Sequence, residues 1–212
     1  MAKIVDEAQG IALIKLIAAK DRKAFEAFYY LYAEGFGRFL MKMLKQKDWV
    51  DEAVNDVMLT VWQSAERYDS ERGRLSTWLF GIAHNKGLKI LERVGRRREE
   101  YLEDLPLEID NDEDNAHAAY ESATHTSSEP ERVVMGWELG DAMSWAFSKL
   151  SADHLAVIEL CFGEDCSYQE IADIVGCPIN TVKTRLFHAR KRLAELLARK
   201  GFSLPEQGKA MV

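Results

Sequence analysis

The chain has 212 residues, of which 47% are apolar, and a formal net charge of −7. This composition is enough to bury the core of one domain or of two small ones, and it excludes a chain that is disordered throughout. The longest apolar run near the amino terminus, residues 11–19, is interrupted by Lys15 and is far shorter than the roughly 20 residues that cross a bilayer. Because no leader peptide is visible either, we expect a cytoplasmic protein without membrane insertion.

The first hundred residues repeat apolar side chains with the period of a helix and without the alternation of a strand. Asp21 suits the start of one helix, and Ser76 suits the cap of another. Between them Tyr68–Arg74 is polar and contains Gly73, which is typical of a loop. We therefore expect a helical domain at residues 1–98, with helices at 10–19, 24–44, 51–64 and 76–94.

Residues 99–131 contain twelve of the 35 acidic residues and no Lys or Arg. The segment is poor in large apolar side chains and ends in Ser, Thr and Pro, which predicts a largely disordered acidic linker at 99–132. The remainder of the chain has 28 basic against 23 acidic residues. The flanking domains are therefore mildly basic, as surfaces that neutralise phosphates should be.

Beyond the linker, helical periodicity returns at 135–150 and 152–161, and a helix-turn-helix is predicted at Ser167–Leu193. Small Ala172 allows a crossing helix to approach, Gly176 suits the turn, and Pro178 suits the entrance to the next helix, which Asn180 or Thr181 can cap. We expect a second domain at 133–200 and a frayed tail at 201–212. The predicted fold is all-α, with two small helical domains joined by the flexible linker.

The second helix of this motif is amphipathic and basic. Val182, Leu186, Ala189 and Leu193 fall at helical spacing and face inward. The opposite side is polar and positively charged, which favours duplex DNA as a partner. That side contains Lys183, Thr184, Arg185, Phe187, His188 and Arg190.

A second candidate surface for nucleic acid lies at residues 78–98, where aromatic residues, His84 and Asn85 precede a basic helix end. Unpaired strands are held by stacking on aromatic rings beside cationic groups. The alternative is that Trp78, Phe80 and Ile82 fill a core, which is at least as common for each of them. The sequence leaves both interpretations open.

The three cysteines, Cys161, Cys166 and Cys177, do not form a pattern that predicts a metal site or a disulfide framework. Even with His154 nearby, the spacing lacks the CxxC or HxxxH element of a zinc site. A thiol redox switch has no support in the sequence. We expect no metal, no cofactor and no catalytic residues.

Three stretches of the chain, residues 18–33, 51–91 and 150–193, resemble in order and spacing the extracytoplasmic-function (ECF) sigma factors of the sigma-70 family. The resemblance implies that the protein is not an enzyme, binds core RNA polymerase and promoter DNA, and starts transcription of stress- or signal-responsive genes. It also implies an anti-sigma factor as a partner. The first domain would open the −10 element and the second would read the −35 element, while the linker would enter the polymerase or act as a solvated spacer.

The resemblance assigns the polymerase contact to one helix of the first domain. Asn55 and Asp56 replace the Gln-Glu pair that is common in the family and keep its chemistry. An acidic and apolar face of this kind can dock on a basic coiled coil. The alternative is a solvated acidic face, which fits Asp51 and Glu52 better than Asp56. The assigned residues are Asp51, Glu52, Asn55, Asp56, Met58, Leu59 and Trp62.

The resemblance also places capture of a flipped −10 base at the Tyr68–Arg74 loop and the helix after it. Asn85 suits base recognition, Tyr68 and Trp78 suit stacking, and the basic groups suit phosphates. Lys86 and Lys89 are equally typical of plain surface lysines. The residues assigned to the −10 element are Tyr68, Asp69, Arg72, Trp78, His84, Asn85, Lys89 and Arg93.

For the −35 element, the resemblance selects the polar residues already identified on the second helix of the helix-turn-helix. Arg185 is the strongest candidate for a guanine or phosphate contact. Lys183 and His188 stand where the family often has Arg, so we expect a −35 preference that differs from that of relatives. The alternative class of function is a stand-alone repressor or activator that binds DNA through the second domain.

Overall fold

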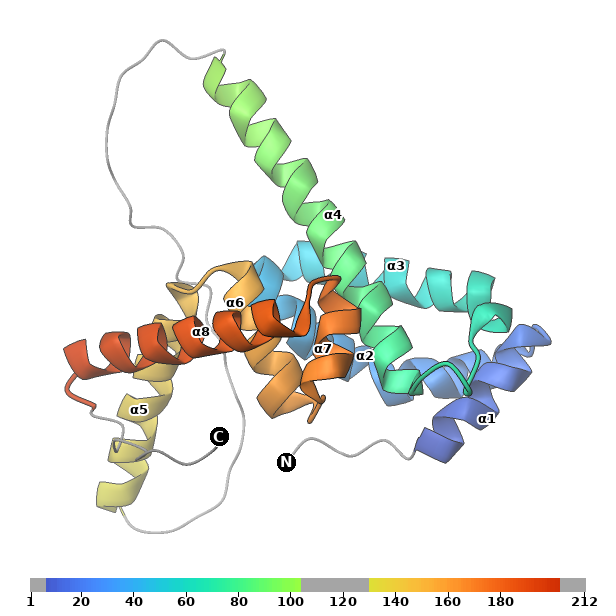
Figure 1. Ribbon diagram of the computed structural model, residues 1–212, viewed down its shortest axis with the longest axis horizontal. Helices are drawn as coiled ribbons and strands as arrows, with labels where there is room; N and C mark the ends of the chain where they lie inside the picture. Colours follow the sequence, from blue (N-terminus) through green and yellow to red (C-terminus); the bar gives the residue numbers. More distant parts are fainter. Residues whose placement is uncertain (1–6, 104–129, 203–212) are drawn as a thin grey trace.

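The computed structural model describes residues 7–103 and 130–202. Within these ranges the regular secondary structure is entirely helical, which confirms the predicted all-α fold (Figure 1). No helix in the same ranges is long and apolar enough to cross a membrane. Most of the predicted linker and nearly all of the predicted tail, residues 104–129 and 203–212, lie outside the described residues.

The first group of helices surrounds α2, which packs against α1, α3 and α4. Aromatic and aliphatic side chains from α2 and α4 fill its core, including Phe28, Phe36, Phe39, Leu40 and Leu79. The bounds of these elements are α1 (Glu7–Ala18), α2 (Arg22–Leu44), α3 (Lys47–Ser64), the 3-10 turn η1 (Ala65–Arg67) and α4 (Leu75–Glu103).

Helix α4 runs beyond the expected start of the linker at residue 99 and ends at Glu103. The arginines and glutamates at its carboxyl end are good helix formers, which accounts for the extension. At the other end, Ser76 does not cap α4, because the helix already begins at Leu75. The Leu75 amide donates instead to Glu7 Oε1 of α1 at 2.9 Å. The expected cap at Asp21 is confirmed, since its Oδ1 accepts the amides of Lys23 and Ala24.

The second group of helices is organised by α8, which packs against α5, α6 and α7. Leu155, Leu160, Ile171, Leu186 and Leu196 are nearly or fully buried between them. The bounds are α5 (Pro130–Ser148), α6 (Ala152–Ile158), the π turn η2 (Glu159–Gly163), α7 (Tyr168–Val175) and α8 (Ile179–Arg199).

The two groups lie against each other in a compact arrangement. Helix α6 packs on α2, and α7 packs on α4, so that the orange helices of the second group meet the blue and green helices of the first (Figure 1). The sequence left open whether the two domains are compact or extended. In this structure they are in contact.

Candidate nucleic-acid interface

Local interactions hold the helix-turn-helix in a defined shape. The Ser167 hydroxyl accepts the Glu170 amide, and the Glu170 carboxylate accepts the Ser167 amide, which forms a capping box at the start of α7. Gly176 ends α7 with φ of 67°, a left-handed conformation that favours glycine. Pro178 stands at the cap position of α8, which begins at Ile179, so Asn180 and Thr181 lie within the first turn and the expectation that either of them caps the helix is wrong. The turn therefore sets the angle at which α8 leaves α7.

Helix α8 presents a basic face to solvent because its apolar residues Val182, Leu186 and Ala189 are buried. Phe187 is 64% exposed on this face, and its ring lies 5.4 Å from that of His188. An exposed aromatic ring among cationic side chains is typical of a contact surface. The exposed residues predicted to read the −35 element are Lys183, Thr184, Phe187, His188 and Arg190.

Arg185 differs from its neighbours on α8. Its side chain is only 31% exposed, and its Nη2 lies 2.8 Å from Oδ2 of Asp153 on α6. The guanidinium is therefore engaged inside the protein rather than presented with the basic face. Its assignment to DNA stays a prediction, and a DNA contact would require exchange of this ion pair.

A basic hollow of about 610 Å³ lies beside α8, between this helix and the turn from α5 to α6. Lys149 and His154 face it from the turn, and His188, Lys191 and Arg192 face it from α8. The α8 residues share one face through their i, i+3, i+4 spacing, which is visible in the sequence. Lys149 and His154 were missed because only the fold brings them to this helix.

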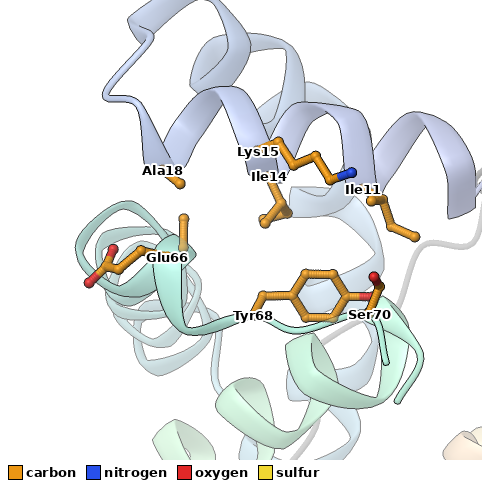
Figure 2. Close-up of a pocket in the computed structure, with 8 residues that line it drawn as sticks. Ile11, Ile14, Lys15, Ala18, Glu66, Tyr68 and Ser70 are labelled. Carbon is orange, nitrogen blue, oxygen red and sulfur yellow. The ribbon is translucent and has the colours of Figure 1, made fainter. Parts of the chain in front are cut away.

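The Tyr68–Arg74 loop closes a pocket of about 320 Å³ against α1 and η1. Figure 2 shows the Tyr68 ring lying across this space, with Ile14 and Lys15 of α1 on the opposite side. The Tyr68 ring also lies 5.5 Å from that of Trp78, and its hydroxyl donates to the Gly73 carbonyl at 3.3 Å. Burial raises the pKa of Tyr68, which keeps the phenol protonated.

Helix α1 was not part of the predicted −10 site, although its Ile11, Ile14, Lys15 and Ala18 line this pocket. The sequence carries no local signal for this, because α1 and the loop are about 50 residues apart and meet only through packing.

The other residues predicted to contact the −10 element differ in how far they are exposed to solvent. Asn85 and Lys89 are exposed on α4, and Asp69 and Arg72 are exposed in the loop. His84 is only 3% exposed, and its Nδ1 has no hydrogen-bond partner among the described residues. Burial is the main cause that lowers the pKa of His84, so the imidazole is held neutral.

Arg93 forms a bidentate ion pair with Glu52, in which Nη1 and Nη2 lie 2.6 and 2.7 Å from the two carboxylate oxygens. On the same side of α4, Lys86 lies 3.6 Å from Asp56. Two residues predicted to contact polymerase thus neutralise two basic side chains of the helix predicted to contact DNA.

The predicted polymerase face of α3 is partly exposed and partly core. Asp51, Glu52, Asn55 and Leu59 are exposed, and Leu59 reaches 52%. Met58 is only 3% exposed, because it lies on the helix side that packs in the core. Half-buried Trp62 packs edge-to-face on Phe25 with ring centroids 5.2 Å apart. The contacts predicted for α3 stay predictions.

Burial lowers the reactivity of two of the three cysteines. Burial is the first cause that raises the pKa of Cys161 and raises that of Cys166 to about 12. A thiol with a raised pKa is a poor nucleophile and a poor metal ligand. Within residues 7–103 and 130–202, no three His, Cys, Asp or Glu side chains are grouped as they would be around a metal ion.

Comparison with known proteins gives matches to both groups of helices. Residues 29–97 match the family model of sigma-70 region 2, and residues 146–193 match that of sigma-70 region 4. The chain is 30% identical over 191 residues to the ECF RNA polymerase sigma factor RpoE of Cereibacter sphaeroides, which covers 90% of this chain and 96% of that protein. It is 29% identical over 184 residues to the ECF RNA polymerase sigma-E factor of Haemophilus influenzae, and the match covers 86% of this chain and 92% of that protein.

A solved structure also has a similar fold. The sigma factor RpoE from Bartonella quintana, crystallised in complex with the anti-sigma factor NepR, has a TM-score of 0.62 at 24% identity, covering 83% of this chain and 98% of that chain.

Proposed function

Because the chain belongs to the ECF sigma factors of the sigma-70 family, we propose that it binds core RNA polymerase and directs it to promoters through their −35 and −10 elements. The observation that carries the proposal is the presence in one chain of two different surfaces. Helix α3 presents an acidic face with an exposed leucine, and α8 presents a basic face with an exposed phenylalanine. A protein that only bound DNA would need the second surface and not the first.

We assign duplex recognition at the −35 element to the exposed face of α8. Lys183 and His188 reach base edges or phosphates, and Phe187 offers an apolar face to a thymine methyl group or a sugar. Lys149, Lys191 and Arg192 of the basic hollow neutralise the adjoining phosphates and fix the register of the helix.

At the −10 element, the pocket beside the Tyr68–Arg74 loop takes a flipped base. Extrusion of a base costs a few kcal/mol of stacking, and a pocket that recovers this energy only for the right base couples strand opening to sequence recognition. Tyr68 supplies a stacking surface from the loop, and Lys15 of α1 supplies a cation close to the strand. Asn85 and Lys89 hold the following nucleotides along α4.

The polymerase contact is assigned to the exposed residues of α3, namely Asp51, Glu52, Asn55 and Leu59, with half-buried Asp56 beside them. Burial of one leucine side chain contributes about 1.5–3 kcal/mol, and the carboxylates steer the helix toward a basic partner. Met58 and Trp62 act from beneath this face by fixing α3 on the core.

The protein has no catalytic chemistry of its own in this proposal and works in the cytoplasm, where polymerase and promoters are. Its activity is held in check by an anti-sigma factor, as the complex formed by its structural relative suggests. The target genes respond to a stress or another signal.

Run-off transcription with purified core polymerase tests the proposal, on promoters identified by sequencing transcript 5′ ends after overproduction. Transcripts that start only when the protein is added support it. High-affinity, promoter-specific DNA binding without core, together with no stimulation of core, supports a stand-alone repressor or activator instead.

Two matched pairs of exposed residues sharpen this test. Leu59→Ala should weaken binding to core about tenfold, whereas Leu16→Ala, at 49% exposure on α1, should not change it. Phe187→Ala should weaken binding of the holoenzyme to the −35 element, whereas Phe162→Ala should not, although both rings are 64% exposed. Equal effects within either pair would contradict the assigned surface.

A further inference from the structure

Glu7, in the first turn of α1, binds the place where the Tyr68–Arg74 loop ends and α4 begins. Its Oε1 accepts the Leu75 amide at 2.9 Å, and its Oε2 accepts a hydrogen bond from Arg74 Nε at 3.1 Å. Arg74 uses a different nitrogen, Nη1, to reach Glu170 of α7 at 3.3 Å. The first amides of a helix have no partner within it, so a carboxylate at this place is favourable. One side chain of α1 therefore fixes both the last residue of the loop and the first residue of α4.

The Glu7 carboxylate also lies close to the other end of the loop. After burial, its negative charge is the next cause that raises the pKa of Tyr68. The Tyr68 hydroxyl donates to the carbonyl of Gly73, the residue before Arg74. The loop is thus closed on itself by Tyr68 and is held on α1 by Glu7.

Close packing holds α1 at a fixed distance from α4. A Cβ at Gly10, one turn after Glu7, would collide with the Tyr32 hydroxyl group of α2 and would lie 2.8 Å from Leu75 Cδ2. Only glycine permits this approach, and Leu75 is fully buried beneath it. The next two turns of α1 form one wall of the pocket, and Figure 2 shows Ile14 there on the opposite side from the Tyr68 ring.

We propose that Glu7 is a positioning residue that sets the width of the −10 pocket and thereby determines how strictly the pocket selects its base. By holding Arg74 and Leu75, it keeps the loop at a constant distance from α1. The inference rests on the proposed function, because that function assigns the pocket to the flipped base. The match to sigma-70 region 2 begins at residue 29, so it assigns no role to α1.

A pocket of fixed width explains selection better than stacking does. Stacking on Tyr68 alone would distinguish the bases poorly, because every base has a π face. Selection requires contact on the opposite side of the base, where a gap of about 0.5–1 Å forfeits roughly a quarter to a half of the dispersion attraction. Release of the loop should therefore lower the affinity for the preferred base about two- to fivefold, while poorly fitting bases lose little.

Base selectivity of the holoenzyme tests this role. The probes are single-stranded oligonucleotides with the −10 sequence, in which each position in turn carries each of the four bases. Binding to the complex of core polymerase with the full chain is followed by fluorescence anisotropy. Glu7→Ala should reduce the preference for the favoured base about two- to fivefold at one position, with unchanged affinity for core and for the −35 duplex. Glu7→Gln keeps an acceptor for the Leu75 amide but loses the charge that attracts Arg74, so its loss should be intermediate.

Two control variants separate this role from a loss of charge and from a loss of stability. Glu26→Ala removes an exposed carboxylate of α2 and should change the affinity equally for all four bases. Leu13→Ala removes a half-buried side chain of α1 outside the pocket lining and should lower the thermal midpoint without changing the base preference. The role of Glu7 is excluded if Glu7→Ala behaves like either control, or if it weakens selectivity equally at every position. If Glu7→Ala fails to fold, Glu7→Gln takes its place in the same comparison.

Tyr68→Ala separates failure of this inference from failure of the proposed function. If the wild-type holoenzyme prefers one base, and Tyr68→Ala abolishes that preference while Glu7→Ala does not weaken it, only the role of Glu7 has failed. If the wild type shows no preference at any position, or if Tyr68→Ala leaves the preference intact, the assignment of the pocket to a flipped base has failed, and the role of Glu7 with it.

Discussion

Glu164 should make the protein less stable as pH rises, whereas a typical carboxylate of a folded protein has the opposite effect. Glu164 follows the π turn η2 at the junction of the two domains, where burial first, and the nearby charge of Glu159 second, raise its pKa to about 7. Arg38 and Lys42 of α2 oppose this increase but do not cancel it. The folded protein therefore holds a proton near neutral pH that the unfolded chain has already released.

This difference makes the stability contribution of Glu164 depend on pH. As pH falls from 8 toward 5, the folded state takes up the proton of Glu164 before the unfolded state does, so this residue contributes increasing stability. The shift from 4.5 to about 7 sets a ceiling of roughly 3.4 kcal/mol on the cost of the charge at high pH. Glu164 is partly exposed, and solvent screening reduces the expected cost to about 1 kcal/mol.

Glu164→Gln removes the charge and keeps the shape of the side chain. At pH 8 the variant should be more stable to urea than the wild type by about 1 kcal/mol, and at pH 5 this advantage should vanish. Urea unfolding followed by circular dichroism from pH 5 to 8 measures the difference, to which His84 contributes little because it titrates in both proteins. Glu92→Gln, an exposed carboxylate of α4, is the control. A difference that does not depend on pH would refute the reasoning.

Three further predictions concern the candidate surfaces. Gly176→Ala places a Cβ on a residue with φ of 67° and should lower the free energy of unfolding by about 1–2 kcal/mol. Thermal unfolding should show a lower midpoint, and an unchanged midpoint would contradict the expected backbone strain. Glu52→Gln releases Arg93 and should raise the affinity of the free chain for the −10 oligonucleotide up to about fivefold. The gain should disappear in an Arg93→Gln background, and a gain that persists there would exclude this pair as its cause. Lys183→Arg should shift −35 preference toward guanine by about 1–3 kcal/mol in competition binding with base-substituted duplexes, and an unchanged ranking would place Lys183 on phosphate.

The helix-turn-helix was predictable because each of its signals is local. Apolar spacing located α7 and α8, and Gly176 located the turn between them. The capping box of Ser167 and Glu170 was also visible, as a serine followed three residues later by a glutamate, but it was not part of the prediction. Such features depend on residues within one or two turns of each other, so a single sequence carries them.

The start of α4 was predicted wrongly for the opposite reason. Ser76 has the right chemistry for a cap, but Glu7 of α1 supplies the carboxylate that accepts the Leu75 amide, and Leu75 is fully buried. Packing of α1 against α4 decides where the helix begins, and no local signal reports it. The ion pair between Lys42 and Glu159 could not be predicted for the same reason. It joins a lysine and a glutamate that are 117 residues apart, and both residue types usually lie at the surface.

Several residues that are predicted to bind partners form ion pairs within this protein. These ion pairs lower the net free energy gained when a partner binds. Glu52 forms an ion pair with Arg93, and Asp153 forms one with Arg185. If these residues contact polymerase or DNA as predicted, the partner has to displace an existing ion pair at each place. The net gain at such a position is the difference between two charge contacts and is smaller than either. Selectivity follows from this exchange, because a partner that offers a single diffuse charge cannot replace a bidentate carboxylate. A phosphate with two oxygens in place can, so if Arg93 contacts DNA as predicted, a nucleic-acid backbone has an advantage there over polyanions with diffuse charge.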